Sequence, residues 1–108
     1  MSGIADSNIS VVNNVFIKQM VFPLVGYRVV THAHVYDHQT LLAVGAVRMT
    51  VDGVSTEYQA PAILIIQAGK HHGIEALKDG TVAYCIHAMT GEEDLVQGIP
   101  NESLAHIA

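Results

Sequence analysis

Positive charge is scarce in this chain. The 108 residues contain five Lys and Arg against ten Asp and Glu, so the formal net charge is −5. No basic residues cluster along the sequence, whereas proteins bind nucleic acids and anionic membranes through such clusters. We therefore expect no nucleic-acid partner and no membrane partner.

Long hydrophobic runs and paired cysteines are also missing. No apolar stretch approaches the roughly 20 residues that a membrane-spanning helix needs. Residues 1–10 have neither the basic start nor the apolar run of a secretory signal peptide. Cys85 is the single cysteine and cannot form an intrachain disulfide, which fits a reducing compartment. These absences predict a cytoplasmic protein.

Several enzyme motifs are absent as well. The sequence has no G-x-S-x-G elbow, no P-loop, no C-x-x-C pair and no dinucleotide-binding fingerprint. It therefore offers no basis for the serine-nucleophile, nucleotide or dithiol chemistry that these motifs support.

Apolar residues, in contrast, are abundant, at 50% of the chain against 14% charged. The length corresponds to one domain. We expect its core over about residues 11–90 and a C-terminal tail over residues 91–108. So high an apolar fraction in a small domain indicates a second buried surface, most simply a homodimer interface.

Turn signals divide the chain into short runs with β-strand character. Asp52-Gly53 and Asp79-Gly80 each predict a tight β-hairpin. Gly45 predicts a bulge or bend. The predicted hairpins join residues 41–51 to 54–60, and residues 72–77 to 81–89.

Three further segments complete this prediction. Residues 47–51 alternate between apolar and polar side chains, as in a half-buried strand. Residues 62–66 are apolar throughout, which predicts a strand buried on both faces. Thr90 followed by acidic residues predicts a short helix over residues 91–97. Many short strands at this spacing favour a sandwich or a jelly-roll barrel.

Histidines form the most informative pattern. His32 and His34 alternate on a strand-like run, so both imidazoles are expected on one side, close enough to share a metal ion. His38 follows them, and His72 lies far downstream. Neutral imidazole is a common ligand of divalent transition metals. The alternative for an isolated His-x-His pair is two strand histidines that are hydrogen-bonded in place.

The histidine spacing resembles the first signature motif of the cupin superfamily, in which most members have glutamate at the position of His38. Residues 67–72, Gln-Ala-Gly-Lys-His-His, partly match the second motif, Pro-x-Gly-x-x-His. Gly69 and His72 are in register, whereas Gln67 occupies the usual proline position. The first motif reads Gly26-x5-His32-x-His34-x3-His38-x6-Gly45.

The resemblance covers about residues 20–90 and implies an all-β fold, the cupin-type jelly-roll barrel or double-stranded β-helix. With histidine in the glutamate position, the sequence is similar to those of the small single-domain cupins that have an all-histidine site. The cofactor implied is a divalent transition metal, with Fe or Mn favoured, and Ni, Zn and Cu suit the same donors. The implied ligands are His32, His34, His38 and His72.

Four neutral imidazoles leave about two open positions on an octahedral ion. Such positions suit the joint binding of O₂ and substrate, or the polarisation of a carbonyl. Three functions therefore remain open, each with a small-molecule partner. They are a dioxygenase-like oxidoreductase, a metal-dependent lyase or isomerase, and a non-catalytic ligand-binding or assembly cupin.

Two other histidines need separate interpretations. His71 would replace His72 as ligand after a one-residue shift of register, but the spacing from Gly69 favours His72 and leaves His71 exposed or at the cavity mouth. His87 is interpreted as a core residue, an interface residue or a cavity residue.

Arg28 and Asp37 each have two interpretations. Arg28 has the strand parity of His32, so it either holds an anionic substrate or covers apolar surface with its stem. Asp37 either orients a ligand histidine or forms a turn. Cys85 is expected to be a small core residue. The remaining candidate pocket polars are Tyr27, Tyr36, Gln39, Glu75 and Tyr84.

Overall fold

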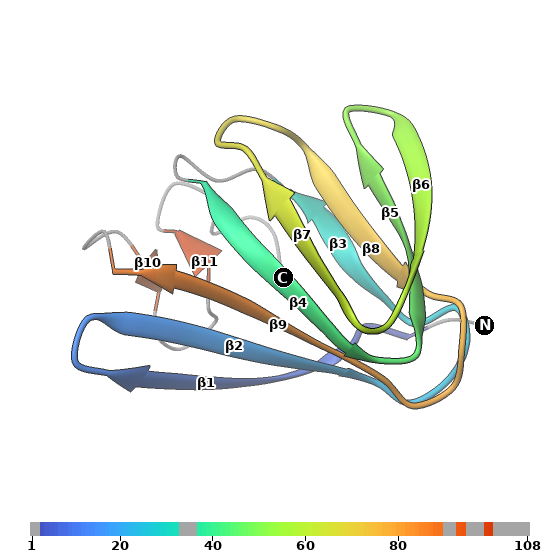
Figure 1. Ribbon diagram of the computed structural model, residues 1–108, viewed down its shortest axis with the longest axis horizontal. Helices are drawn as coiled ribbons and strands as arrows, with labels where there is room; N and C mark the ends of the chain where they lie inside the picture. The colour runs from blue at the N-terminus through green and yellow to red at the C-terminus, as the bar shows by residue number, and fades with distance from the viewer. Residues whose placement is uncertain (1–2, 33–36, 90–92, 95–98, 101–108) are drawn as a thin grey trace.

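The computed structural model describes residues 3–32, 37–89, 93–94 and 99–100 of the chain. Every regular element in it is a β-strand, which confirms the predicted all-β class (Figure 1). The strands are β1 (Asp6–Val12), β2 (Val15–Phe22), β3 (Arg28–His32), β4 (His38–Val44), β5 (Ala46–Val51), β6 (Val54–Gln59), β7 (Ala62–Ile66), β8 (His72–Ala76), β9 (Thr81–Ala88), β10 (Glu93–Asp94) and β11 (Ile99–Pro100).

Two antiparallel sheets form the body of the molecule (Figure 1). The larger has the strand order β1-β2-β9-β4-β7, and the smaller has the order β3-β8-β5-β6. Strands that are distant in sequence are neighbours in each sheet, because β9 lies between β2 and β4, and β8 lies between β3 and β5. This winding of the chain between two sheets is that of a jelly-roll barrel.

The core lies between the inner faces of the two sheets. In β2 every second residue is buried, including Phe16, Met20 and Phe22, because strand side chains alternate between faces. Leu42 and Leu64 extend the same inner face across the larger sheet. The smaller sheet contributes Val29, Val47, Met49, Ile74 and Ala76.

Two glycine-containing turns have the predicted form. Asp52 and Gly53 have φ values of 47° and 84°, and they close the β5–β6 hairpin. Gly45 has a φ of 91° at the bend between β4 and β5, and a Cβ there would collide with Thr81. Gly45 thus lets the chain leave one sheet and enter the other.

Three sequence-based expectations are wrong. Asp79-Gly80 does not close a hairpin, because β8 pairs with β3 and β5 whereas β9 pairs with β2 and β4. The turn instead carries the chain from one sheet to the other. β7 is not buried on both faces, because Leu64 and Ile66 face the core whereas Ile63 and Ile65 on the outer face are uncovered in the described part of the chain. Glu93–Asp94 form β10 and pair with β11, so the predicted helix does not form there. The other residues of that helix lie outside the described part.

No helix in the described ranges is long and apolar enough to cross a membrane.

Candidate metal centre

The two sheets bring two of the predicted ligands together. His38 is the first residue of β4 in the larger sheet, and His72 is the first residue of β8 in the smaller one. Both are buried, with 3% and 2% of their surface exposed. Their ring centroids lie 5.1 Å apart and the ring planes are inclined at 48°. The fold therefore creates a histidine pair from residues that are far apart in sequence.

His32 reaches the register position beside His72 through an irregularity in β3. Val29 pairs with Ile74, so an unshifted antiparallel ladder would place Thr31 opposite His72. The register shifts between Val29 and His32, and His32 becomes the backbone partner of His72. One extra residue on β3, as in a β-bulge, produces this shift.

The full four-histidine set is not assembled in the described part of the chain. His34 lies outside the described residues, and of His32 only the backbone position is described. Among the described residues, no group of three or more His, Cys, Asp or Glu is arranged to hold a metal ion. The predicted ligand set therefore stays a prediction. Of its four members, His32, His34, His38 and His72, the structure brings together His38 and His72.

The environment of His72 suits a metal ligand. Its Nδ1 lies 3.2 Å from the carbonyl oxygen of Lys70. In the tautomer that donates this hydrogen bond, Nε2 keeps its lone pair. Burial lowers the pKa of His72, the Lys70 carbonyl opposes this shift, and neighbouring His71 lowers the pKa further. A neutral imidazole is the form that binds a metal.

Two aspartates hold the loop before His72 in place. Asp37 Oδ1 accepts a hydrogen bond of 2.7 Å from the Ala68 amide, which ties the loop to the start of β4. Asp52 Oδ1 accepts one of 3.0 Å from the His71 amide, and the Asp52 amide donates one of 2.8 Å to the His71 carbonyl. Of its two interpretations, Asp37 therefore has the role of a loop residue.

The predicted choice between the adjacent histidines agrees with burial, since His72 is buried and His71 is exposed.

His87 has the role of a cavity residue. Its ring stacks on Phe16 with centroids 4.7 Å apart, and its Nδ1 lies 2.8 Å from the Ala88 carbonyl oxygen. The depression that it lines, with a volume of about 380 Å³, is bordered by Asp37, His38, Gln39, Ile65, Ile86, His87 and Ala88.

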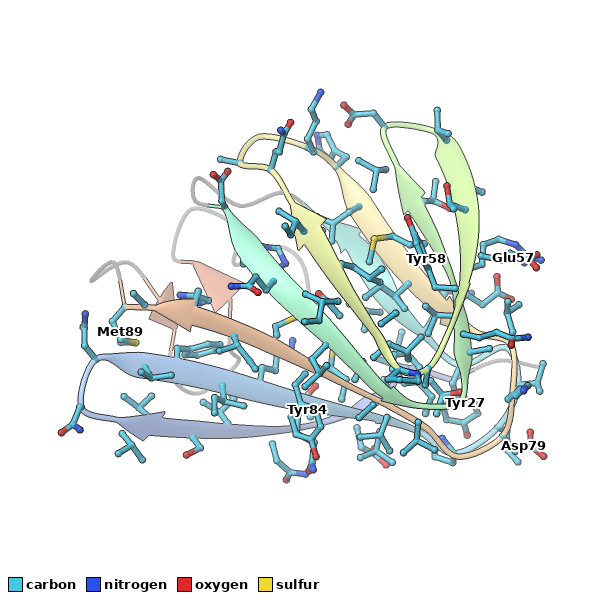
Figure 2. All side chains as sticks on the ribbon, in the orientation of Figure 1. Tyr27, Glu57, Tyr58, Asp79, Tyr84 and Met89 are labelled. Carbon is cyan, nitrogen blue, oxygen red and sulfur yellow. The ribbon has the colours of Figure 1, made fainter. Side chains whose placement is uncertain are left out.

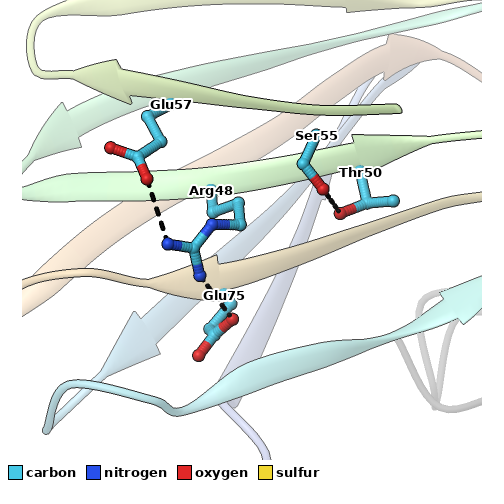
Figure 3. Close-up of polar contacts among 5 residues, drawn as sticks. All are labelled: Arg48, Thr50, Ser55, Glu57 and Glu75. Atoms are coloured by element: carbon cyan, nitrogen blue, oxygen red, sulfur yellow. Dashed lines mark hydrogen bonds and ion pairs between the residues drawn. The ribbon is translucent and has the colours of Figure 1, made fainter. Parts of the chain in front are cut away.

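Arg28 does not face the interior. It is exposed, because the register shift in β3 breaks the common parity that would link it to His32. Glu75 also serves the outer surface, where its Oε1 accepts a hydrogen bond of 3.3 Å from Arg48, which in turn pairs with Glu57 at 3.0 Å (Figure 3). An anchor for an anionic ligand must therefore be sought elsewhere.

The other candidate pocket polars have varied positions. Tyr84 accepts a hydrogen bond of 3.0 Å from Gln19 Nε2 in neighbouring β2 (Figure 2). Tyr27 packs against the core, at the end of the barrel where Asp79 also lies (Figure 2). Gln39 borders the depression, and Tyr36 lies outside the described residues.

Lys18 is a polar residue of the interior that motif reasoning missed. It lies in β2 with only 2% of its surface exposed. Burial lowers its pKa to about 8, and a smaller interaction with Cys85 opposes this shift. The signal was present in the sequence, because Lys18 has the same parity as Phe16, Met20 and Phe22.

Solved structures with the same arrangement of strands are known. KdgF from Halomonas sp. aligns over 76% of each chain with a TM-score of 0.68 and 15% identity. A cupin domain from Bordetella pertussis aligns over 83% of this chain and 98% of its own, with a TM-score of 0.68 and 18% identity. An RmlC-like cupin family protein with a double-stranded β-helix fold, from Methanocaldococcus jannaschii, covers 78% of this chain and 79% of its own, with a TM-score of 0.69 and 15% identity.

The chain has the cupin fold. The resemblance inferred from the histidine motifs is therefore confirmed for the fold. No profile of a known protein family and no curated protein matches the sequence. Likeness at 15–18% identity establishes the fold alone, so the function of this chain is argued below from its own residues.

Proposed function

We propose that this cupin binds one divalent transition metal ion through His32, His34, His38 and His72. The observation that carries the proposal is the buried pair of His38 and His72, with ring centroids 5.1 Å apart. Two imidazoles that ligate one ion at about 2.1 Å have ring centres roughly 5 Å apart when they occupy neighbouring positions. The pair therefore fits a shared ion.

The other two ligands follow from strand geometry. Residues directly opposite each other in an antiparallel ladder belong to the same face of the sheet, and His32 is the backbone partner of His72. His34 alternates with His32 in sequence, which supports it as the fourth ligand. Such an all-nitrogen donor set accepts iron or manganese, the ions we expect, and also nickel, zinc or copper.

We propose a dioxygenase-like oxidoreductase activity on a small substrate. When bound, the ion supplies Lewis acidity and, for iron or manganese, one-electron chemistry. The chain itself supplies fixed ligands, since Asp37 and Asp52 hold the loop before His72. Neutral imidazoles leave the full charge of the ion in place, which favours an anionic substrate. The depression beside His38 and His87 has the volume of a small-ligand site.

The test is metal analysis of protein purified without a histidine tag, followed by screening of small organic substrates for O₂ consumption. We expect about one metal ion per chain and substrate-dependent O₂ uptake that is lost after chelation. Conversion of substrate without O₂ uptake would identify a lyase or isomerase, and binding without conversion would identify a ligand-binding cupin. Protein that takes up no iron, manganese, nickel, zinc or copper would contradict the proposal.

We also propose that the protein is a cytoplasmic homodimer that pairs through the outer face of β7 and β4. Ile63 and Ile65 on this face expose 65% and 74% of their surface, and Leu41 lies beside Ile63 in the ladder. Large apolar side chains grouped on a sheet face are typical of protein contacts. A second copy of the chain would cover the same face on both subunits, as two-fold symmetry requires.

A further inference from the structure

Lys18 is a charged side chain inside the barrel. Its neighbours on the inner face of β2 are Phe16 and Met20, each with 1% of its surface exposed. Lys18 itself exposes 2%, and its Nζ atom is buried without a hydrogen-bond partner in the described part of the chain. A lysine that only covers apolar surface would instead carry its ammonium group to water.

The direct cross-strand partners of Lys18 offer its ammonium no negative charge. Cys85 of β9 is its direct cross-strand partner, and Thr40 of β4 follows on the other side of Cys85. Burial raises the pKa of the Cys85 thiol, so this group is neutral at pH 7. On the β1 side the ladder partner is Ile9. Because the pKa of Lys18 is about 8, its amine is mostly protonated at pH 7. A buried ammonium in this setting is complementary to an anion.

Lys18 also lies on the same inner sheet face as His38, one member of the histidine pair. Thr40 and Cys85 occupy one row of the inner face, and His38 and His87 lie two residues further along the same strands. Strand spacing of about 4.8 Å and a rise of about 3.4 Å per residue place the backbones of Lys18 and His38 about 12 Å apart. A lysine and an imidazole that extend toward each other can therefore be bridged by a ligand of a few atoms.

We propose that Lys18 anchors the carboxylate of a small organic acid inside the barrel, with the other end of the acid directed toward His38 and His72. This deepens the proposed function and depends on it for the orientation of the ligand, whereas the ion pair at Lys18 does not require the metal. The contact is a hydrogen-bonded ion pair between Nζ and the carboxylate. No covalent bond is formed.

The experiment measures binding of small monocarboxylates, from acetate to benzoate, together with the matching neutral amides. Thermal shift and calorimetry are used on the parent, on Lys18→Met and on Lys78→Met. Methionine retains most of the length and the apolar stem of lysine, so Lys18→Met is expected to fold. Lys78 is exposed, and Lys78→Met removes the same charge from the surface. Metal content is measured for each protein.

We expect at least one carboxylate, but not its amide, to bind the parent and Lys78→Met. Lys18→Met should bind that carboxylate at least tenfold more weakly and retain the metal content of the parent. Equal carboxylate binding by Lys18→Met and the parent, or no carboxylate binding by the parent, would overturn the proposal. Lys18-dependent binding in a protein that takes up no metal would retain the anchor and refute the metal proposal.

Discussion

At the scale of single residues, burial shifts two titratable side chains of the barrel interior in the same direction. The pKa of Lys18 falls to about 8 and that of His72 falls below its ordinary value, because burial penalises the charged form of each. The consequences differ. His72 becomes a neutral group that suits a metal, whereas Lys18 stays mostly charged at neutral pH and weakens the fold.

Replacing Lys18 by methionine should therefore stabilise the protein. The folded-state pKa of about 8 lies below the unfolded value of 10.5, so the unfolded state binds more protons between these values. The penalty is complete below pH 8 and disappears as pH rises toward 10.5. We expect Lys18→Met to raise the free energy of unfolding by about 3 kcal/mol at pH 7 in the absence of ligand. Urea denaturation of parent and variant from pH 7 to pH 10.5 measures the difference.

The matched control is Lys78→Met, whose effect should stay within about 0.5 kcal/mol at every pH because Lys78 is exposed. The raised thiol pKa of Cys85 lowers stability at high pH in every variant, and this loss is larger in Lys18→Met because Lys18 lowers the Cys85 pKa in the parent. A Lys18→Met protein that is less stable than the parent at pH 7 would show that the lysine has a structural role.

At the scale of elements, local sequence signals identified turns better than strand partners. Asp52-Gly53 closes the hairpin it predicted, whereas Asp79-Gly80 leads into the opposite sheet. A turn motif fixes a reversal of the chain over four residues and carries no information about which strands then pair. Pairing depends on contacts between segments that are distant in sequence.

The alternation of apolar and polar residues along a strand likewise predicted only part of the strand arrangement. It placed one face of β5 in the core, yet in β7 the uniformly apolar sequence could not show that one face is left uncovered. The register shift in β3 was equally hidden, and it exposes Arg28 while setting His32 opposite His72. A bulge depends on the partner strand, so parity within one strand cannot reveal it.

Gly45 gives an element-scale prediction. It has a φ of 91°, and an added Cβ would collide with Thr81. We expect Gly45→Ala to lower the free energy of unfolding by about 3 kcal/mol, because backbone strain and overpacking act together. Gly80→Ala is the control, since Gly80 has a φ of 71° but an added Cβ would meet no atom within 4 Å.

Gly80→Ala should cost about 1 kcal/mol, the strain of the left-handed backbone alone. Denaturant titration of the two variants compares them directly. Equal losses in the two proteins would show that the close approach of Thr81 to Gly45 is unimportant.

At the scale of the whole molecule, the histidine motifs predicted the fold, and two of the four histidines that they single out, His38 and His72, lie together. The motifs predicted the fold because their spacing reflects where strands begin. His38 is the first residue of β4, and His72 is the first residue of β8. Lys18 was missed because it belongs to neither motif. Its position on the same sheet face as His38 becomes visible only when β2, β9 and β4 are set side by side.

The exposed face of β7 leads to a prediction about assembly. Ile65→Lys places a charge in the proposed interface and should shift a homodimer toward monomer by at least tenfold in dissociation constant. Val54→Lys is the control, because Val54 is 69% exposed on β6 in the other sheet. Size-exclusion chromatography with light scattering measures the mass. A parent that is monomeric at all micromolar concentrations would contradict the dimer.

The central claim is that His38 and His72 bind one metal ion together. It is tested most directly by titrating metal-free protein with Co²⁺ and following the absorption of the bound ion in the parent, His38→Ala, His72→Ala and His71→Ala. We expect one ion per chain in the parent and in His71→Ala, because His71 is exposed. His38→Ala and His72→Ala should each bind at least tenfold more weakly and give a changed spectrum, since each loses one imidazole donor. If all three variants match the parent in affinity and spectrum, His38 and His72 are not ligands and the proposed metal centre does not exist.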